Sequence, residues 1–427
     1  MTSVLEFESD VSETWRAPST VRVALAGCGA VGSALLTELV ARRATLAERH
    51  GIEVVLTRIL VRDVHRERAA PFDRTLLTSD VDEFLAAESD VVVEAIGGLE
   101  PALQIARESL ARGRELLTAN KELLAAHGSE LTALALRRGG ALRYDAAVGG
   151  GVPVLRLLDD ALGAGTPSRV RGILNGTSNF VLTRLEEGAT LESALRAARH
   201  AGFAEADASR DLDGRDAAAK LALVAWAAFG VEPESVIVRR RSLLPDPQRY
   251  VTLGERFERT VRQVAEAALV DGEVVSSVEP LLVEQGSALA RTRDEQNRIE
   301  VHTGWSAPLC ASGPGAGGVP TATALLSDLV ASRSPARRPA RRCGDCTDAR
   351  RSWWAIEVVG APALLHRHVP LPGVVHTDAT ARSSWAIIGG ATADDVDVLL
   401  RRLDGEGASP IAVRFDDADE PSTRGCA

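Results

Sequence analysis

The feature that most constrains the fold is a glycine-rich turn between an apolar run and a helical pattern. Residues 21–26 are mostly apolar and partly β-branched, and they lead into Gly27-Cys28-Gly29-Ala30-Val31-Gly32, with leucines at helical spacing beyond. Glycines in such a strand–turn–helix unit let the main chain approach a pyrophosphate, which binds the amide groups that begin the helix. The pattern predicts a dinucleotide site at Gly27, Gly29, Ala30, Val31 and Gly32; a turn without a ligand is the plainer alternative.

The chain of 427 residues is long enough for two or three domains. Its 45% hydrophobic and 25% charged residues are ordinary for a globular protein and exclude a disordered chain, a collagen and a small disulfide scaffold. The formal net charge of −10 argues against a protein dedicated to nucleic acid, which needs a basic face. We therefore expect a small-molecule ligand.

The cysteines and the apolar runs bear on location. The five cysteines are few, odd in number and without disulfide spacing, which predicts reduced thiols and a cytoplasmic protein. No stretch approaches about 18 uninterrupted apolar residues, and the first residues are acidic where a signal peptide would be basic. We expect no membrane segment.

Lysine is almost absent from this chain. Of 49 basic residues, only Lys121 and Lys220 are lysines, as a codon bias toward arginine would produce. An arginine stays protonated at every working pH, whereas a lysine can be tuned by its surroundings to give up a proton. The two exceptions therefore mark candidate functional sites, with chance survival as the alternative.

Several runs predict further strands of a parallel sheet. The run over 54–61 ends at Arg62-Asp63, where the second strand of a dinucleotide fold meets the adenosine ribose. Arg62, helped by His65 or Arg66, would bind a 2′-phosphate, whereas Asp63 would accept from the 2′-hydroxyl of NAD. The sequence favours NADP and leaves NAD open, and a solvated charge cluster is the plainer alternative.

The next predicted strands lead toward the first lysine. A strand over 90–96 stops at Gly97-Gly98, and a helix over 101–112 leads to a strand over 115–118. Lys121 follows that strand at its carboxyl end, where open α/β sheets bind ligands. Residues 141–155 predict a strand, a glycine-rich turn and a helix, and the carbonyl oxygens of such a loop can hold a hard cation.

The densest constellation spans sixteen positions and leads into an apolar helix predicted over 217–229. It comprises Glu205, Asp207, Asp211, Asp213, Asp216 and Lys220. Asp216 and Lys220 are four residues apart and share one helix face. A surface ion pair is the usual interpretation, but the rarity of lysine and the apolar helix favour a catalytic site. Residues 171–180, polar in the middle and apolar at the flanks, are typical of a segment that covers a ligand.

The second half of the chain is less informative. Phe257, Val261, Val264 and Ala268 predict an amphipathic helix of the core, and the glycine-rich residues 313–321 open a helix through Leu329. Residues 331–351 are rich in Ser, Pro and Arg and predict a linker, whose Cys343 and Cys346 form a single CxxC that disfavours zinc. Beyond it we predict strands over 353–359, 384–388 and 410–415 and a helix over 392–403.

Together, these motifs resemble those of the homoserine dehydrogenases over residues 20–330. The resemblance rests on residues 27–32, 118–121, 148–153, 172–177, 204–207 and 313–321, with Asp216 and Lys220. It implies an α/β fold: after an extension (1–19), a Rossmann-type NAD(P)-binding domain (20–147, completed by 311–330), then an α+β catalytic and dimerisation domain (148–310). The linker (331–351) and a small, divergent ACT-like α+β module (352–418) follow.

The resemblance also implies an activity and residue roles. The reaction is the NAD(P)H-dependent reduction of L-aspartate 4-semialdehyde to L-homoserine, the branch step toward threonine and methionine, by a homodimer or homotetramer. Lys220 is the implied proton donor, with Asp216 and Lys121 completing the catalytic set. The implied substrate-binding residues are Glu205, Asp211, Asp216, Gly176 and Thr177; the implied cofactor residues add Arg62, Gly97, Lys121, Gly202 and Gly315 to the glycine turn. Asp145, Val148, Gly150 and Val152 would hold a monovalent cation, Na⁺ or K⁺.

The chain departs from the family pattern at three places. Asp145 stands where glutamate is usual, Phe203 where tyrosine is common, and the C-terminal module lacks the usual Asp-Lys-Pro-Gly signature, so threonine feedback stays open. Two alternatives follow. One is a paralogue that reduces a related substituted semialdehyde in specialised metabolism. The other is a sensor without turnover, against which the two retained lysines argue.

Overall fold

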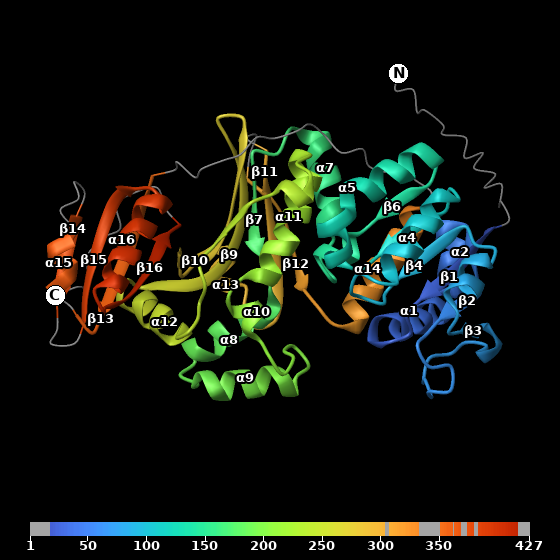
Figure 1. Cartoon of the computed structure of the whole chain (residues 1–427), viewed down its shortest axis with the longest axis horizontal. Coiled ribbons are helices and arrows are strands. Elements are labelled where there is room, and N and C mark those ends of the chain that lie inside the picture. Colours follow the sequence, from blue (N-terminus) through green and yellow to red (C-terminus); the bar gives the residue numbers. More distant parts are fainter. Residues whose placement is uncertain are drawn as a thin grey trace, which may run out of the picture.

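The computed structural model describes residues 18–303, 307–332, 351–361, 363–368, 374–379 and 383–416. Its strands form two sheets that lie at opposite sides of Figure 1, with the chain start in blue at one end and the C-terminal strands in red at the other. Most of the predicted extension and linker, and Cys343, Cys346 and Cys426, lie outside the described residues. Cys28 and Cys310 are free thiols.

The first sheet has six strands in the order β3-β2-β1-β4-β5-β6, and every pair in it is parallel. This is the strand order of the Rossmann fold, which confirms the predicted class. The strands are β1 (Ser19–Ala26), β2 (Ile52–Leu60), β3 (Leu77–Thr78), β4 (Val91–Glu94), β5 (Glu115–Thr118) and β6 (Ala141–Arg143). Their carboxyl ends meet at one edge, where the chain order reverses between β1 and β4.

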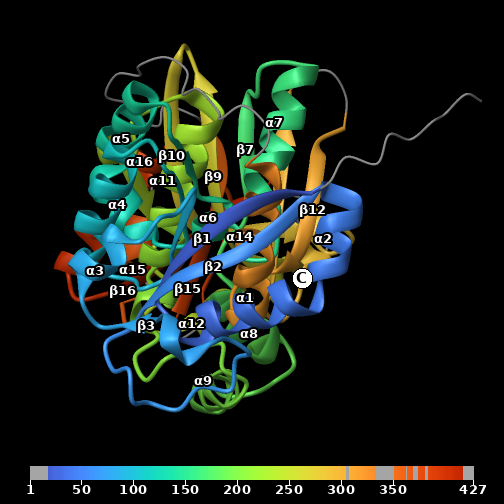
Figure 2. The ribbon, with the colours of Figure 1, turned by 90° about the vertical axis from the view of Figure 1, so that its right-hand side faces the viewer.

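Helices cover both faces of this parallel sheet. They are α1 (Ala30–Ala41), α2 (Arg43–His50), η1 (Arg74–Leu76), α3 (Val81–Ala86), α4 (Ala102–Ala111) and α5 (Lys121–Arg138). A distant helix, α14 (Gly318–Ala331), joins the same layer as α1, as Figure 2 shows. Leu325 and Leu329 of α14 are buried in one core with Leu35 and Leu36 of α1, because each helix presents an apolar face to β1. The chain therefore returns to the first sheet after building most of the second.

The second sheet has ten strands. Their order is β12-β11-β7-β9-β10-β16-β13-β15-β14, and β8 also pairs with β10. The strands before the C-terminal region are β7 (Arg169–Ile173), β8 (Val238–Arg240), β9 (Arg259–Val270), β10 (Glu273–Glu284), β11 (Gln296–His302) and β12 (Leu309–Pro314). The helices are α6 (Asp145–Val148), α7 (Val154–Ala164), α8 (Gly176–Glu186), α9 (Leu191–His200), α10 (Ser209–Leu212), α11 (Arg215–Phe229), η2 (Pro233–Ser235), α12 (Pro247–Arg256) and α13 (Ala288–Arg291).

The helix predicted from Phe257, Val261, Val264 and Ala268 is wrong. Phe257 is the C-cap of α12, and the other three positions lie within β9, which forms an antiparallel hairpin with β10. Residues 261–268 are buried on both faces of the strand, and an apolar run of that kind also satisfies a helical spacing. The hairpin turn is Asp271-Gly272, with φ of 51° and 88°, a dipeptide that favours this turn because both residues tolerate positive φ. That turn signal outweighs the apolar spacing.

The C-terminal region continues the second sheet instead of forming a sheet of its own. Its elements are β13 (Ser352–Val359), α15 (Ala363–His368), β14 (Val374–Ala379), β15 (Ser383–Ala391), α16 (Ala393–Gly405) and β16 (Ser409–Phe415). This succession is the β-α-β-β-α-β pattern of ferredoxin-like units. The predicted strands and helix are present, and β14 was not predicted. β16 pairs in parallel with β10 through Leu281 and Leu282.

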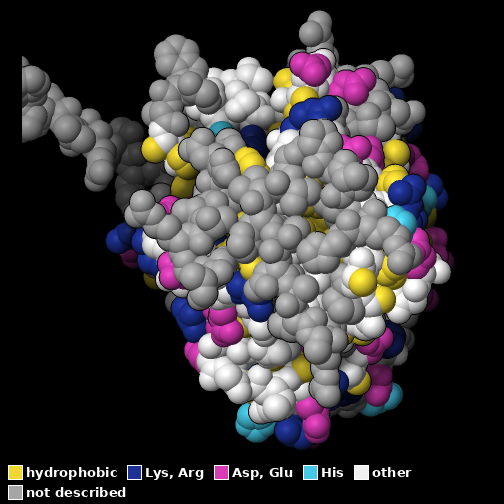
Figure 3. Space-filling model, turned by 90° about the vertical axis from the view of Figure 1, so that its left-hand side faces the viewer, with side chains coloured by type: hydrophobic (Ala, Val, Ile, Leu, Met, Phe, Trp, Pro, Cys, Tyr) yellow, Lys and Arg dark blue, Asp and Glu magenta, His cyan; other side chains and the backbone are white. Residues whose placement is uncertain are grey.

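Two cores meet at this C-terminal region. One lies within it, under α15 and α16, whereas the other combines Trp385 and Phe415 with Phe257 and Leu282. Figure 3 shows this end of the molecule, where basic and acidic side chains of the described residues are intermixed around the margin. In the part of the chain that the structure describes, no helix combines the length and apolar character needed to cross a bilayer. The identity of the region as an ACT-like module stays a prediction.

Candidate active site

Both lysines bind one carboxylate. Asp216 and Lys220 lie one turn apart on α11, and Lys220 Nζ is 3.0 Å from Asp216 Oδ2. Lys121, the first residue of α5, places its Nζ 3.2 Å from the other oxygen, Asp216 Oδ1. α5 follows the parallel sheet and α11 covers the second sheet, so this carboxylate lies where the two sheets meet. The two side chains on α11 are nearly buried, at 11% and 13% exposure, whereas Lys121 is 35% exposed.

Asn175 completes this cluster. It is the N-cap of α8, and its Oδ1 accepts from Ser178 N at 2.7 Å, as short polar side chains do at helix starts. Its Nδ2 donates to Asp211 Oδ1 at 2.7 Å and to Asp216 Oδ2 at 3.0 Å. The preceding carbonyl, Leu174 O, accepts from Lys220 Nζ at 3.0 Å. The predicted covering segment is thus the end of β7 and the start of α8, and it forms one wall of the cluster.

The pKa values of the two aspartates of the cluster are shifted in opposite directions. Burial would raise the pKa of Asp216, but the charges of Lys220 and Lys121 and the hydrogen bonds from Lys220 and Asn175 outweigh it, so that pKa lies well below its ordinary value. Burial raises the pKa of Asp211, with Asn175 opposing and the charge of Asp216 adding to the shift. A cationic ligand group beside Asp211 would offset that cost. The cluster therefore presents a fixed ammonium, Lys220, and a carboxylate, Asp211, that forms no ion pair with the residues described by the structure.

The glycine turn at the start of α1 is shaped for close approach. Gly27 has a φ of +100°, and a Cβ there would lie 2.5 Å from Ala95 O; a Cβ on Gly32 would lie 2.0 Å from Gly27 O. Neither position tolerates a side chain, so the turn needs both glycines. Gly29, the N-cap of α1, has no atom within 4 Å of its Cβ position and makes no side-chain cap. The open amide groups fit a pyrophosphate.

A buried glutamate shapes the neighbouring loop. Glu94, at the end of β4, accepts from Ile96 N at 2.8 Å and Gly97 N at 3.2 Å, and its other oxygen accepts from Thr118 Oγ1 at 2.6 Å. Gly97 and Gly98 have positive φ and open space beside them. Asn120, the N-cap of α5, donates to Gly98 O at 2.6 Å. Sequence reasoning missed both roles, although a lone glutamate in an apolar strand and an asparagine before a helix were the available signals.

The structure separates some predicted residues from the lysine cluster. Glu205 and Gly202 are exposed, although Thr177 Oγ1 donates to Phe203 O at 2.6 Å and so holds their segment against α8. Asp207 accepts from Ser209 N and Asp213 from Arg215 N, so both serve local turns. Gly176 packs closely on the residue before β11, since a Cβ there would lie 2.6 Å from Glu295 O.

The end of β2 carries the predicted ribose residues. Arg62 is exposed, and the carboxylate of Asp63 accepts from His65 N at 2.8 Å and Arg66 N at 3.2 Å. The backbone hydrogen bond from His65 is the main reason that the pKa of Asp63 is lowered. One oxygen of Asp63 is thus engaged by its own turn, while Arg62 stays accessible.

The predicted cation loop lies beside two buried carboxylates. Asp145 Oδ1 accepts from Leu155 N at 3.0 Å, and Asp145 N donates to Asp328 Oδ2 of α14 at 3.2 Å. Burial raises the pKa of Asp145 to about 6; burial, followed by the charge of Asp145, raises that of Asp328 to about 8. No group of three or more His, Cys, Asp or Glu side chains suited to a metal occurs among the described residues. Asp145 and the main-chain oxygens of Val148, Gly150 and Val152 remain the candidate ligands.

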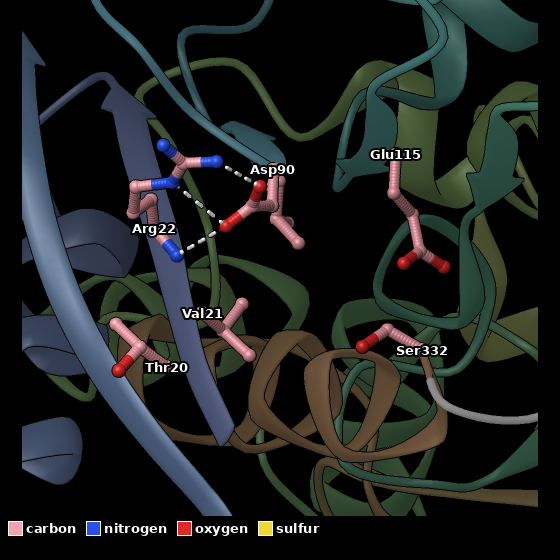
Figure 4. A pocket seen from close by; sticks show the side chains of 7 residues that line it. Thr20, Val21, Arg22, Asp90, Glu115 and Ser332 are labelled. Atoms are coloured by element: carbon pink, nitrogen blue, oxygen red, sulfur yellow. Dashed lines mark hydrogen bonds and ion pairs between the residues drawn. The ribbon is translucent and has the colours of Figure 1, made fainter.

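An open hollow of about 600 Å³ lies at the opposite edge of the parallel sheet (Figure 4). Arg22, Asp90 and Glu115, at or near the amino ends of β1, β4 and β5, line it together with Ser332 at the end of α14. Arg22 donates three hydrogen bonds to Asp90, two from its guanidinium at 2.7 and 3.1 Å and one from its main-chain N at 2.9 Å. Because parallel α/β sheets bind ligands at their carboxyl ends, this hollow is separate from the candidate site.

Asp216→Asn should destabilise the protein by about 3 kcal/mol at neutral pH, since two ammonium groups then lose their counter-charge. The folded-state pKa of Asp216 is lowered, so its stabilising contribution is present above its unfolded pKa and is lost as the pH falls through the folded value. The difference in the free energy of unfolding between the variant and the wild type should therefore shrink below about pH 4. Urea unfolding between pH 3 and 7 measures it.

The matched control is Glu205→Gln, which removes an exposed carboxylate from the same acidic stretch and should change stability by less than about 0.5 kcal/mol. Equal effects of the two substitutions at neutral pH would contradict the role given to Asp216.

Comparisons with known proteins agree with this geometry. Family models described as homoserine dehydrogenase and its NAD-binding domain match residues 153–330 and 27–145. The homoserine dehydrogenase of Bacillus subtilis is 35% identical over 315 residues, which cover 73% of this chain and 72% of that protein. That of Mycobacterium leprae is 36% identical over 318 residues, again 73% and 72%.

A solved structure extends the match to most of the chain. The crystal structure of a homoserine dehydrogenase from Thiobacillus denitrificans superimposes with a TM-score of 0.81 at 26% identity, covering 94% of this chain and 99% of that one. The chain therefore belongs to the homoserine dehydrogenase family and is an NAD(P)-dependent oxidoreductase.

Proposed function

We propose that this enzyme reduces L-aspartate 4-semialdehyde to L-homoserine, with Lys220 as the proton donor. The observation that carries the proposal is the placement of both lysines of the chain on one carboxylate, at the carboxyl edge of a dinucleotide-binding sheet. When bound, the dihydronicotinamide supplies the hydride. The remaining steps fall to this chain's own residues.

Lys220 is held so that one hydrogen is left for the substrate. An ammonium has three donors, and two of those of Lys220 are taken by Asp216 Oδ2 and Leu174 O, each at 3.0 Å. The third would protonate the aldehyde oxygen as negative charge develops on it. Because Asp216 and the Leu174 carbonyl fix the direction of that donor, little reorganisation is needed at the moment of reaction.

The acidic side chains would recognise the substrate's amino group. An amino-acid semialdehyde carries an ammonium, which needs a carboxylate partner, and Asp211 is half-buried with a raised pKa. Gly176 and Thr177 offer main-chain amide groups at the start of α8, which favours the substrate's carboxylate there. Glu205 would join them from the segment that Thr177 anchors. Lys121 would lie between cofactor and substrate.

Lys220→Arg should lower kcat by about 10²- to 10⁴-fold, the usual contribution of a positioned proton donor, because arginine keeps its charge but does not release its proton. The absorbance at 340 nm, followed with L-homoserine and NADP at alkaline pH, measures it. Binding of NADPH, measured by fluorescence, should survive in the variant. Turnover within fivefold of the wild type would rule out Lys220 as the donor.

We further propose NADP as the preferred cofactor. Arg62 is exposed at the end of β2 and would donate to a 2′-phosphate. Asp63, which would accept from a 2′-hydroxyl, already has one oxygen engaged by main-chain amides.

Arg62→Ala should raise the KM for NADPH by about 10-fold or more, the loss of a charge-assisted hydrogen bond, and leave the KM for NADH within twofold. Arg49→Ala, an exposed arginine in the last turn of α2 at the other edge of the sheet, is the matched control. Equal KM changes for both cofactors would count against the phosphate contact.

The cation proposal rests on charge. Asp145 and Asp328 are buried together, and within the described residues neither forms an ion pair. A monovalent cation held by Asp145 and the carbonyl oxygens of Val148, Gly150 and Val152 would offset their charge. Replacing KCl or NaCl by choline chloride at equal ionic strength should lower both the midpoint of thermal unfolding and the activity. At a cation concentration ten times its Kd, the lost free energy of unfolding is about 1.4 kcal/mol. Equal midpoints in all three salts would exclude the site.

The remaining inferences from the sequence stay predictions. A homodimer or homotetramer is tested by light scattering of the purified protein, and a cytoplasmic location by fractionation. A paralogue with a substituted semialdehyde as substrate would turn over that compound faster than L-homoserine in the same 340 nm assay.

A further inference from the structure

Asn297 is buried with nothing to bind. It lies on β11 at 1% exposure, and both its Oδ1 and its Nδ2 lack a hydrogen-bond partner. Within the described residues, no other buried amide side chain has both its oxygen and its nitrogen unpaired. A buried amide in this state carries a desolvation penalty, so such a group calls for a partner that arrives in another state of the protein.

The amide lies against the loop of residues 313–317. A Cβ on Gly315 would lie 2.0 Å from Asn297 Cγ and Nδ2, so position 315 is glycine because the amide occupies that space. On its other side, the loop packs against residues 149–151. Gly151 N donates to Pro314 O at 3.0 Å, and a Cβ on Gly150 would lie 2.4 Å from Gly315 O. These two loops are the connections between the two sheets.

This junction touches both halves of the candidate site. Arg298, next to Asn297, pairs with Ile173, the residue before the Leu174 carbonyl that receives Lys220. At the far end of the loop, a Cβ on Gly318 would lie 2.8 Å from Ala30 O, in the glycine turn that begins α1. The loop thus runs from the proton donor's sheet to the dinucleotide turn. Its outer residues Pro314, Ala316 and Gly317 are exposed, which leaves it room to move.

We propose that Asn297 is a positioning residue for the cofactor loop: its amide pairs with the main chain of residues 313–317 when NAD(P)H is bound. This inference rests on the proposed cofactor. The unliganded protein bears the cost of an unpaired amide, and cofactor binding removes that cost by seating the loop on it. Part of the binding free energy of the cofactor therefore comes from removing the cost of the unpaired amide.

The test is Asn297→Leu, which keeps the approximate size of the side chain and removes both polar atoms. The unliganded variant should melt at the wild-type temperature or above it, because the buried unpaired amide is gone. Its Kd for NADPH, measured by fluorescence titration without substrate, should rise about tenfold, since the seated loop then lacks its partner. Asn297→Ala serves the same purpose if the leucine does not fit beside Gly315.

Asn179→Leu is the matched control, because Asn179 is equally buried but its Nδ2 already donates to the carbonyls of Thr292, Asp294 and Gln296. It should lower the unliganded melting temperature. If Asn297→Leu and Asn297→Ala do the same and leave the Kd for NADPH within twofold, Asn297 is merely structural and the inference is overturned. A wild-type protein that binds neither NADPH nor NADH would overturn the proposed function instead, and this inference with it.

Discussion

The carboxylate of Asp216 is the interaction on which the arrangement of this enzyme depends. It accepts from a lysine of α11 through one oxygen and faces a lysine of α5 through the other, and these helices belong to different sheets. Two ammonium groups so close would repel each other without the negative charge between them. The attraction therefore fixes how the dinucleotide-binding part meets the second sheet, and Asn175 and the Leu174 carbonyl orient Asp216 and Lys220.

The second constraint is the absence of side chains where the two parts meet. Gly27 and Gly32 allow the first turn to close, and Gly150 and Gly315 allow two connecting loops to pack main chain against main chain. Each of these positions would place a Cβ within 2.5 Å of another atom, so the junction excludes every larger residue. The charged side chains of Asp216, Lys121 and Lys220 form one side of the site, and the glycine loops form the other. The specificity of the site therefore depends on few side chains.

Local patterns with one physical meaning were predictable from the sequence. The glycine turn and the Asp216–Lys220 spacing each specify a geometry, and the structure has both. The apolar spacing from Phe257 to Ala268 fits a helix or a strand buried on both faces, and only the turn at Asp271-Gly272 separates the two. Asn175 binds Asp211 and Asp216, and Glu94 binds Thr118, all distant in the chain, so no local pattern reveals these contacts. The usable clues were the N-cap signature of Asn175 and the lone glutamate in an apolar strand.

The position of β16 has a consequence for biosynthesis. This strand comes last in chain order among the described elements, yet it lies inside the sheet, between β10 and β13. As the chain leaves the ribosome, the dinucleotide-binding strands are complete long before the other sheet can close, and part of the edge of β10 waits with unpaired amide and carbonyl groups. Synthesis of β16, and not that of Lys121 and Lys220, is then the event that completes this sheet.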